Sequence, residues 1–308
     1  VAKAALEITV EDVTVTYPNK GTITVKANVD GKYTIKVKDT EYEVNVIGGE
    51  GSFDVSEVLT AGTYAIAWDV AETANYTGAT GSANYIVENT APDFSISGTE
   101  EINYGQTNTI VPTINADATG TISYKINGSD AGSAGVKEGF VTDALPAGHY
   151  TVVANYSGDT NYGEAIAEFE FDVLPIDVEV TVENVEVVYP NTGTVTVTAS
   201  VPGTYTVTIN KKDYEVTVGE EGTGSVAVTD VFAAGDYPIA VTADLGNNYK
   251  PVNIPNAATY SVGKAESTIA VTYADGTCTV TLDGVNDEKL SETYHIVIDN
   301  VNKDDSAT

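Results

Sequence analysis

The chain has 308 residues, with 45 acidic and 14 basic side chains and a formal net charge of −31 at pH 7. Every basic residue is a lysine, since the sequence contains no arginine. Binding of nucleic acid depends on Lys and Arg at the phosphates, and anionic lipid surfaces attract basic segments. The charge therefore argues against both kinds of partner, and the length has room for two or three ordinary domains.

Cysteine content and hydropathy set two further limits. Cys278 is the single cysteine, so no disulfide can form within the chain. No apolar run approaches the roughly 18 residues of a membrane-spanning helix, so we expect no membrane insertion in this segment. The sequence begins with Val1 and shows no signal peptide, and we expect it to be a mature or excised piece.

The first elements in chain order are short alternating segments separated by turns. Tyr17-Pro18-Asn19-Lys20-Gly21 predicts the first turn, because proline, asparagine and glycine supply the required backbone angles. Alternation of apolar and polar residues predicts half-buried strands. The predicted strands of this first stretch cover residues 8–15, 23–29, 31–37, 42–46, 53–55, 64–68 and 83–87.

One motif recurs along the chain. It reads Ala61-Gly62-Thr63-Tyr64, Ala147-Gly148-His149-Tyr150 and Ala234-Gly235-Asp236-Tyr237. A fixed period indicates an array of equivalent modules. A glycine that turns the chain, followed by a tyrosine that begins a strand, is typical of the corner before the sixth strand of an immunoglobulin-like sandwich, where the phenol bonds back to nearby backbone.

The repeat predicts four segments: module 1 over residues 1–90, module 2 over 91–175, module 3 over 176–263, and a partial fourth module or strand-exchange tail over 264–308. Module 3 repeats module 1 almost strand for strand, whereas the polar, glycine-rich stretch 127–135 of module 2 predicts a loop at a sheet edge. Val262-Gly263-Lys264-Ala265 resembles Val1-Ala2-Lys3-Ala4. We therefore expect the sequence to be a window onto a longer array.

The predicted fold class is all-β, with tandem immunoglobulin-like β-sandwiches in an elongated array. Valine, isoleucine, threonine and tyrosine dominate the strands, and turn signals recur at the spacing of a sandwich. We expect Val/Ile/Tyr cores, with Trp68 filling that of module 1. The joints around Pro92 and Pro175 are short, which predicts limited bending.

No catalytic, cofactor-binding or metal-binding residue is predicted, and we expect that the chain is not an enzyme. Nucleophilic catalysis needs a base beside the nucleophile, but the histidines are only His149 and His295. Both are predicted to lie on strands, His149 exposed at the corner. Cys278 takes the place of apolar core residues, which predicts a buried, inert thiol.

Calcium at the joints is a minority hypothesis. Calcium takes oxygen ligands from Asp, Glu, Asn and backbone carbonyls, and such side chains lie in or near the joints: Glu88, Asp93, Asp159, Asn161 and Asp177. No calcium-loop consensus is present, and a chain with 45 acids places some of them there by chance. The favoured interpretation is solvated acids.

Three Asn-x-Ser/Thr sequons begin at Asn75, Asn127 and Asn155. Such sequons are acceptors for glycosylation in exported proteins. Asn75 is predicted to lie in a loop, whereas Asn155 is predicted to lie on the strand that follows the second corner.

The modules resemble bacterial and archaeal Ig-like repeats of large cell-surface adhesin-like proteins. The resemblance is carried by the Leu-x-Ala-Gly-x-Tyr corners, by the turn Tyr104-Gly105-Gln106 and by Tyr156-Ser157-Gly158-Asp159-Thr160-Asn161-Tyr162. Modules 1 and 3 depart from it with Tyr-Pro-Asn turns, and Phe232 replaces the corner leucine in module 3. The resemblance implies an extracellular, cell-surface location and a stalk or adhesive role, and it assigns no functional residue.

These observations predict a non-catalytic, rod-like stalk of Ig-like repeats on the cell surface. Its expected partners are neighbouring modules, identical subunits, or a cell-surface protein or glycan. One alternative is a subunit of a self-assembling surface filament, joined by strand complementation through its terminal segments. A second is a carbohydrate-binding module, which needs exposed aromatic residues clustered on one face.

Overall fold

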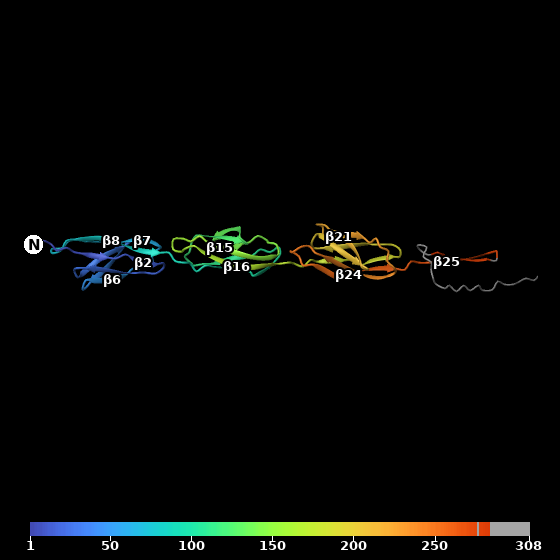
Figure 1. The fold of residues 1–308 in the computed structure, drawn as a ribbon, viewed down its shortest axis with the longest axis horizontal. Coiled ribbons are helices and arrows are strands. Elements are labelled where there is room, and N and C mark those ends of the chain that lie inside the picture. The colour runs from blue at the N-terminus through green and yellow to red at the C-terminus, as the bar shows by residue number, and fades with distance from the viewer. Residues whose placement is uncertain (276, 284–308) are drawn as a thin grey trace, which may run out of the picture. The chain divides into compact units, whose positions relative to one another are not determined.

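A computed structural model describes residues 1–275 and 277–283 as an all-β protein (Figure 1). These residues contain no helix, and hence none long and apolar enough to cross a membrane. The predicted all-β fold class is confirmed. The chain divides into two compact units; Val1–Leu174 is the first, and the second begins at Pro175.

The first pair of sheets, here called sandwich 1, lies within residues 8–88. Its smaller sheet has the order β1-β3-β6, and its larger sheet the order β2-β8-β7-β4-β5. The strands are β1 (Ile8–Val10), β2 (Val13–Thr16), β3 (Thr22–Ala27), β4 (Gly31–Val37), β5 (Thr40–Val46), β6 (Glu50–Asp54), β7 (Gly62–Val70) and β8 (Ala79–Glu88). All pairings are antiparallel except that of β2 with β8.

Sandwich 2, within residues 95–174, pairs a sheet of order β14-β11-β9 with one of order β10-β16-β15-β12-β13. The strands are β9 (Ser95–Ser97), β10 (Glu101–Asn103), β11 (Thr109–Thr113), β12 (Thr121–Ile126), β13 (Ser129–Gly135), β14 (Phe140–Val141), β15 (Gly148–Tyr156) and β16 (Ala165–Leu174). The prediction of a loop over 127–135 is wrong, because β13 pairs with β12. A register shift beside Tyr124 and the positive φ of Gly132 accommodate its polar, glycine-rich sequence.

Sandwich 3, within residues 180–263, repeats the orders of sandwich 1 as β17-β19-β22 and β18-β24-β23-β20-β21. The strands are β17 (Val180–Val182), β18 (Val185–Val188), β19 (Thr194–Ala199), β20 (Gly203–Ile209), β21 (Lys212–Val218), β22 (Thr223–Ala227), β23 (Gly235–Ala243) and β24 (Val252–Gly263). In each sandwich the second half of the divided first strand pairs in parallel with the last strand, and the other pairings are antiparallel. Two facing sheets in this order define an immunoglobulin-like sandwich.

Each sandwich has its own apolar core. Burial alternates along β3, where Ile23, Val25 and Ala27 are buried between exposed neighbours, as expected for a strand with one face on the core. Trp68 does not fill the core of sandwich 1 as predicted. It is half-buried at the margin and packs over β8, where a Cβ on Gly81 would lie 2.2 Å from the indole.

The glycine–tyrosine corner has the predicted hydrogen bond in all three sandwiches. Tyr64 Oη donates to Thr60 O at 2.8 Å, Tyr150 Oη to Pro146 O at 2.8 Å, and Tyr237 Oη to Ala233 O at 2.9 Å. The corner glycines have φ values from +155° to +159°, which L side chains rarely adopt. The glycine therefore permits the bend, and the phenol ties it to the preceding backbone.

In sandwiches 1 and 3, a second tyrosine accepts a backbone hydrogen bond inside the sandwich. Gly21 N donates to Tyr85 Oη at 2.7 Å, and Gly193 N donates to Tyr260 Oη at 2.8 Å. Sandwich 2 has Phe171 at this register position. Its equivalent of the glycine is Asn108, whose N–H bonds instead to Thr142 Oγ1 at 2.9 Å.

A hairpin of β25 (Thr268–Ala274) and β26 (Thr277–Asp283) follows sandwich 3. Ile269, Val271 and Tyr273 alternate along β25 and are all exposed. Cys278 lies opposite Tyr273 and is also exposed, so the prediction of a buried thiol is wrong. The reason is that no described segment covers this apolar face. His295 and most of the predicted fourth module lie outside the described residues.

Replacement of a buried tyrosine by phenylalanine should affect the thermal stability of sandwiches 1 and 2 differently. Tyr85→Phe leaves the buried N–H of Gly21 without its acceptor, which costs about 1–3 kcal/mol. The Tyr124 hydroxyl is buried and has no hydrogen-bond partner among residues 1–275 and 277–283, so Tyr124→Phe is the matched control. In calorimetry we expect Tyr85→Phe to lower the transition of sandwich 1 by about 4 °C or more. Tyr124→Phe should leave that of sandwich 2 unchanged or higher; equal losses would contradict the assignment.

Candidate functional site

In the first unit, the loop between β15 and β16 is held by several hydrogen bonds to one side chain. Asp159 holds it: Oδ1 accepts the N–H groups of Asn161 at 2.8 Å and Tyr162 at 2.9 Å. Oδ2 accepts the N–H of Thr119 at 2.7 Å and its hydroxyl at 3.0 Å. One carboxylate therefore joins this loop to the loop that precedes β12.

These donors also set the ionisation of Asp159. Desolvation alone would raise its pKa, but the backbone N–H groups of Thr119, Tyr162 and Asn161 outweigh that effect and lower the pKa to about 2. Hydrogen bonds to a charged carboxylate favour the charged form. The loop is therefore organised around an anion at all ordinary pH values.

The loop binds the linker that leads into its own sandwich. Thr90 N donates to Asn161 O at 3.0 Å, and Gly163 N donates to Thr90 O at 2.9 Å, which forms a short parallel bridge. The other two sandwiches have the same bridge, at Ala4 with Tyr76 and at Ile176 with Tyr249. The entering segment is therefore tied by main-chain bonds in each sandwich.

The same loop also contacts sandwich 1. Asn161 Oδ1 accepts the N–H of Ala61, the alanine of the first corner, at 3.0 Å. Tyr17 of sandwich 1 donates its hydroxyl to Asp117 Oδ2, while Tyr162 donates to Oδ1 at 2.7 Å. The two phenol rings meet edge to face, with centroids 5.6 Å apart. Tyr17 packs against the cores of both sandwiches, so the junction is apolar as well as polar.

Asp117 is the shared acceptor of this junction. Its pKa is lowered first by the hydrogen bond from Tyr17 and then by that from Tyr162. The bond to Asp117 in turn raises the pKa of Tyr17. Burial, followed by the bond to Asp117, raises the pKa of Tyr162. The junction therefore pairs one carboxylate with two neutral phenols.

The polar side chains of the junction are bonded to one another and to the backbone. Both oxygens of Asp159 already accept N–H and O–H donors. Asp177, also considered as a calcium ligand, pairs with Lys250 at 3.0 Å. Across residues 1–275 and 277–283 no group of three or more His, Cys, Asp or Glu side chains could hold a metal ion. The arrangement is that of a mechanical joint between two sandwiches.

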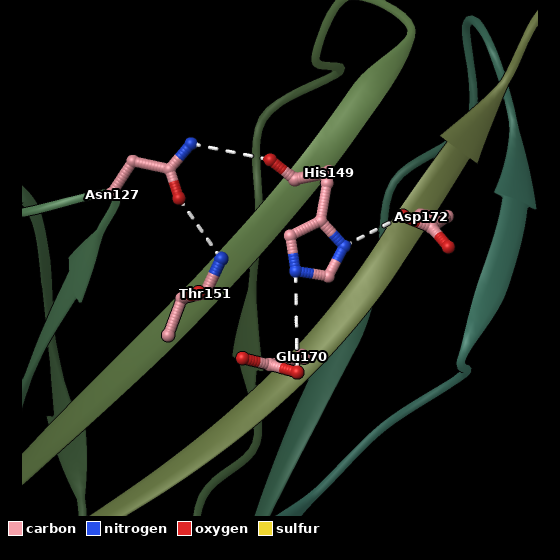
Figure 2. A network of polar contacts seen from close by, with 5 residues as sticks. All are labelled: Asn127, His149, Thr151, Glu170 and Asp172. Atoms are coloured by element: carbon pink, nitrogen blue, oxygen red, sulfur yellow. Dashed lines mark hydrogen bonds and ion pairs between the residues drawn. The ribbon is translucent and has the colours of Figure 1, made fainter.

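His149 lies on β15 with an exposed side chain, as predicted (Figure 2). Its Nδ1 is 2.8 Å from Asp172, and its Nε2 is 4.0 Å from Glu170 on the neighbouring strand. Figure 2 also shows the carboxamide of Asn127, which bonds to His149 O and to Thr151 N. The imidazole thus faces two exposed carboxylates, and neither is a hydroxyl or thiol nucleophile of the kind that general-base catalysis activates.

Sequence reasoning placed Asp159 and Asn161 near a joint but missed Asp117 and Tyr17. Asp117 lies in the connection from β11 to β12, which has four residues more than the matching connections of sandwiches 1 and 3. That insertion was a usable signal, since it marks where the repeat is interrupted. No comparable sequence signal distinguished Tyr17, because the turn that contains it also occurs in module 3.

No protein-family model matches this sequence, and no curated protein matches it either. Solved structures that resemble it include a three-domain tandem from titin, with 16% identity, a TM-score of 0.26, and coverage of 84% of this chain and 100% of that one. An I-band fragment of titin has 14% identity and a TM-score of 0.31, with coverage of 85% and 98%. The immunoglobulin domains 1–5 of Sidekick-1 have 13% identity and a TM-score of 0.35, with coverage of 84% and 59%.

Removal of Asp117 should uncouple the two phenols from the junction. We expect Asp117→Ala to speed hydrogen exchange at the N–H groups of Ala61 and Thr90. Tyr162, in the loop that holds them, loses the carboxylate that it shares with Tyr17. Tyr17→Phe should speed exchange in the wild-type background and add little to Asp117→Ala. Asp130→Ala, at an exposed site on β13, is the control. Additive effects would show that the pair does not act as a unit.

The pKa of Asp159 predicts an acid-dependent stability. Its folded value of about 2 lies below the unfolded value near 3.9, so its contribution is full above about pH 4 and disappears as the pH falls toward 2. Asp159→Asn should therefore lower the melting temperature of sandwich 2 at pH 7, and the gap to wild type should narrow by pH 2.5. A gap that is constant from pH 7 to pH 2.5 would contradict this role.

Proposed function

We propose that this chain is a non-catalytic structural spacer, a stalk of Ig-like repeats displayed on the cell surface. The tandem Ig-like repeat fold itself fits a structural or adhesive role. The observation that carries the proposal is the repeated bridge at Ala4, Thr90 and Ile176, where each sandwich binds its entering linker through main-chain hydrogen bonds. A bound linker transmits force and orientation, whereas a free one would act as a tether.

The first junction supports the same role with side-chain contacts. Asn161 bonds to the corner alanine of sandwich 1, and Asp117 bonds to Tyr17. Such nearest-neighbour contacts add stability along an array without any long-range contact.

The net charge of the chain supports its proposed display in an aqueous medium. A net charge of −31 keeps the chain soluble and opposes non-specific association. The cell-surface location is supported by the resemblance of the corner and loop motifs to adhesin-like repeats.

One observation favours the filament alternative. The exposed Ile269, Val271 and Tyr273 of β25 form an apolar strand face of the kind that a second copy of the chain could cover. The carbohydrate-binding alternative finds less support. Tyr273 is the one aromatic side chain that is largely exposed in the described residues, so they present no aromatic cluster for a sugar.

Antibody labelling of intact cells tests the location. An antibody raised against residues 95–174 should label unpermeabilised cells, and an external protease should remove that signal. Labelling only after permeabilisation would overturn the surface assignment. Electron microscopy of the purified 308-residue chain distinguishes the spacer from the self-assembling filament. A spacer should appear as single particles, whereas filaments would support the alternative.

A further inference from the structure

Asn75 presents a free carboxamide on a fixed loop. The loop between β7 and β8 is closed by Thr73, whose Oγ1 accepts Tyr76 N at 3.1 Å and whose N–H donates to Tyr76 O at 3.0 Å. Asn75 O accepts Ala4 N at 2.9 Å. The Asn75 side chain is exposed and makes no hydrogen bond within the part of the chain that the structure describes. Its backbone is thus held while its amide faces solvent.

The other two sequon asparagines are engaged by the fold. Asn127 has a φ of +48°, and its carboxamide bonds to Thr151 N at 2.9 Å and to His149 O at 3.4 Å (Figure 2). Asn155 is half-buried within β15, which is paired with strands on both sides. A transferase could reach Asn155 only after β15 had left the sheet, and could use Asn127 only after its hydrogen bonds had broken.

We propose that Asn75 is the N-glycosylation site of the folded chain, an inference that rests on the proposed extracellular location. Thr77 supplies the hydroxyl residue of the sequon. In the transfer, Asn75 Nδ2 forms a bond to the anomeric carbon of an oligosaccharide carried on a lipid phosphate. The bond from that carbon to the phosphate oxygen breaks, the oxygen keeps the electron pair, and Nδ2 loses one proton to solvent or a transferase base.

The position of Asn75 gives this glycan a structural consequence. Asn75 and Asn161 are equivalent, since each precedes the tyrosine that bridges the entering linker. In sandwich 2 that carboxamide is 3.0 Å from the N–H of Ala61, in the contact that joins two sandwiches. A glycan on Asn75 would fill the corresponding space on sandwich 1. Glycosylation there and the docking of an Ala-Gly-x-Tyr corner therefore exclude one another.

The test is transfer in vitro to the folded 308-residue chain by a purified oligosaccharyltransferase with a lipid-linked oligosaccharide. Peptides that span each of the three sequons serve as competence controls. We expect every peptide to be modified and the folded chain to gain one glycan, mapped to Asn75 by mass spectrometry. Asn75→Gln should abolish the gain, and Thr77→Ser should retain it.

Two results would overturn the inference: a folded chain that stays unmodified at Asn75 while its peptide reacts, or equal modification at Asn127 or Asn155. The reaction in vitro does not depend on where cells place the chain. If transfer to Asn75 fails while intact cells are labelled, the glycosylation proposal is wrong and the surface location stands. If transfer to Asn75 succeeds while only permeabilised cells are labelled, the surface location is wrong and Asn75 remains the accessible acceptor.

Discussion

The carboxylate of Asp159 is the group on which the organisation of the first unit depends. Its two oxygens bind four donors, and those bonds fix the conformation of residues 159–162. Because that loop is fixed, the backbone of Asn161 is placed to bind Thr90, and its side chain is placed to bind Ala61. The Asp159 carboxylate thus fixes the loop, and the loop binds both the linker at Thr90 and the corner of sandwich 1 at Ala61.

The three repeats reach the same main-chain bridge with different side chains. Thr73 closes the first loop through its hydroxyl, whereas Asp159 closes the second through a carboxylate. In the third, Asp244 accepts the N–H of Gly246 at 3.1 Å. The bridge depends on backbone shape, which several capping residues can stabilise. The junction contact with Tyr17 is more particular, since it needs Asp117 and therefore the insertion that carries it.

The sequence was sufficient for features that are local and periodic. Strand alternation and the glycine–tyrosine motif predicted the sandwiches and the corner hydrogen bonds. A φ that favours glycine and a phenol four residues from its acceptor are both local requirements. The prediction for 127–135 failed because β12 supplies hydrogen bonds to a polar edge strand whatever its side chains. Propensity is a weak guide at such edges.

Tertiary features were beyond the sequence for a different reason. Cys278 was predicted to be buried by analogy with earlier modules, but burial depends on a covering segment, which the pattern of one strand does not specify. Asp117 and Tyr17 are 100 residues apart, and only Asp117 lies in a connection that interrupts the repeat. Their pairing follows only from the way that sandwich 2 meets sandwich 1.

The central claim is that sandwiches 1 and 2 are joined as one body through the loop at Asp159. Nitrogen-15 relaxation of the backbone amides in the intact chain tests it most directly, because it reports how each sandwich tumbles. The account predicts that amides of β3 and β7 and those of β12 and β15 fit a single rotational diffusion tensor at pH 7. Separate tensors with different correlation times for the two sandwiches would contradict it.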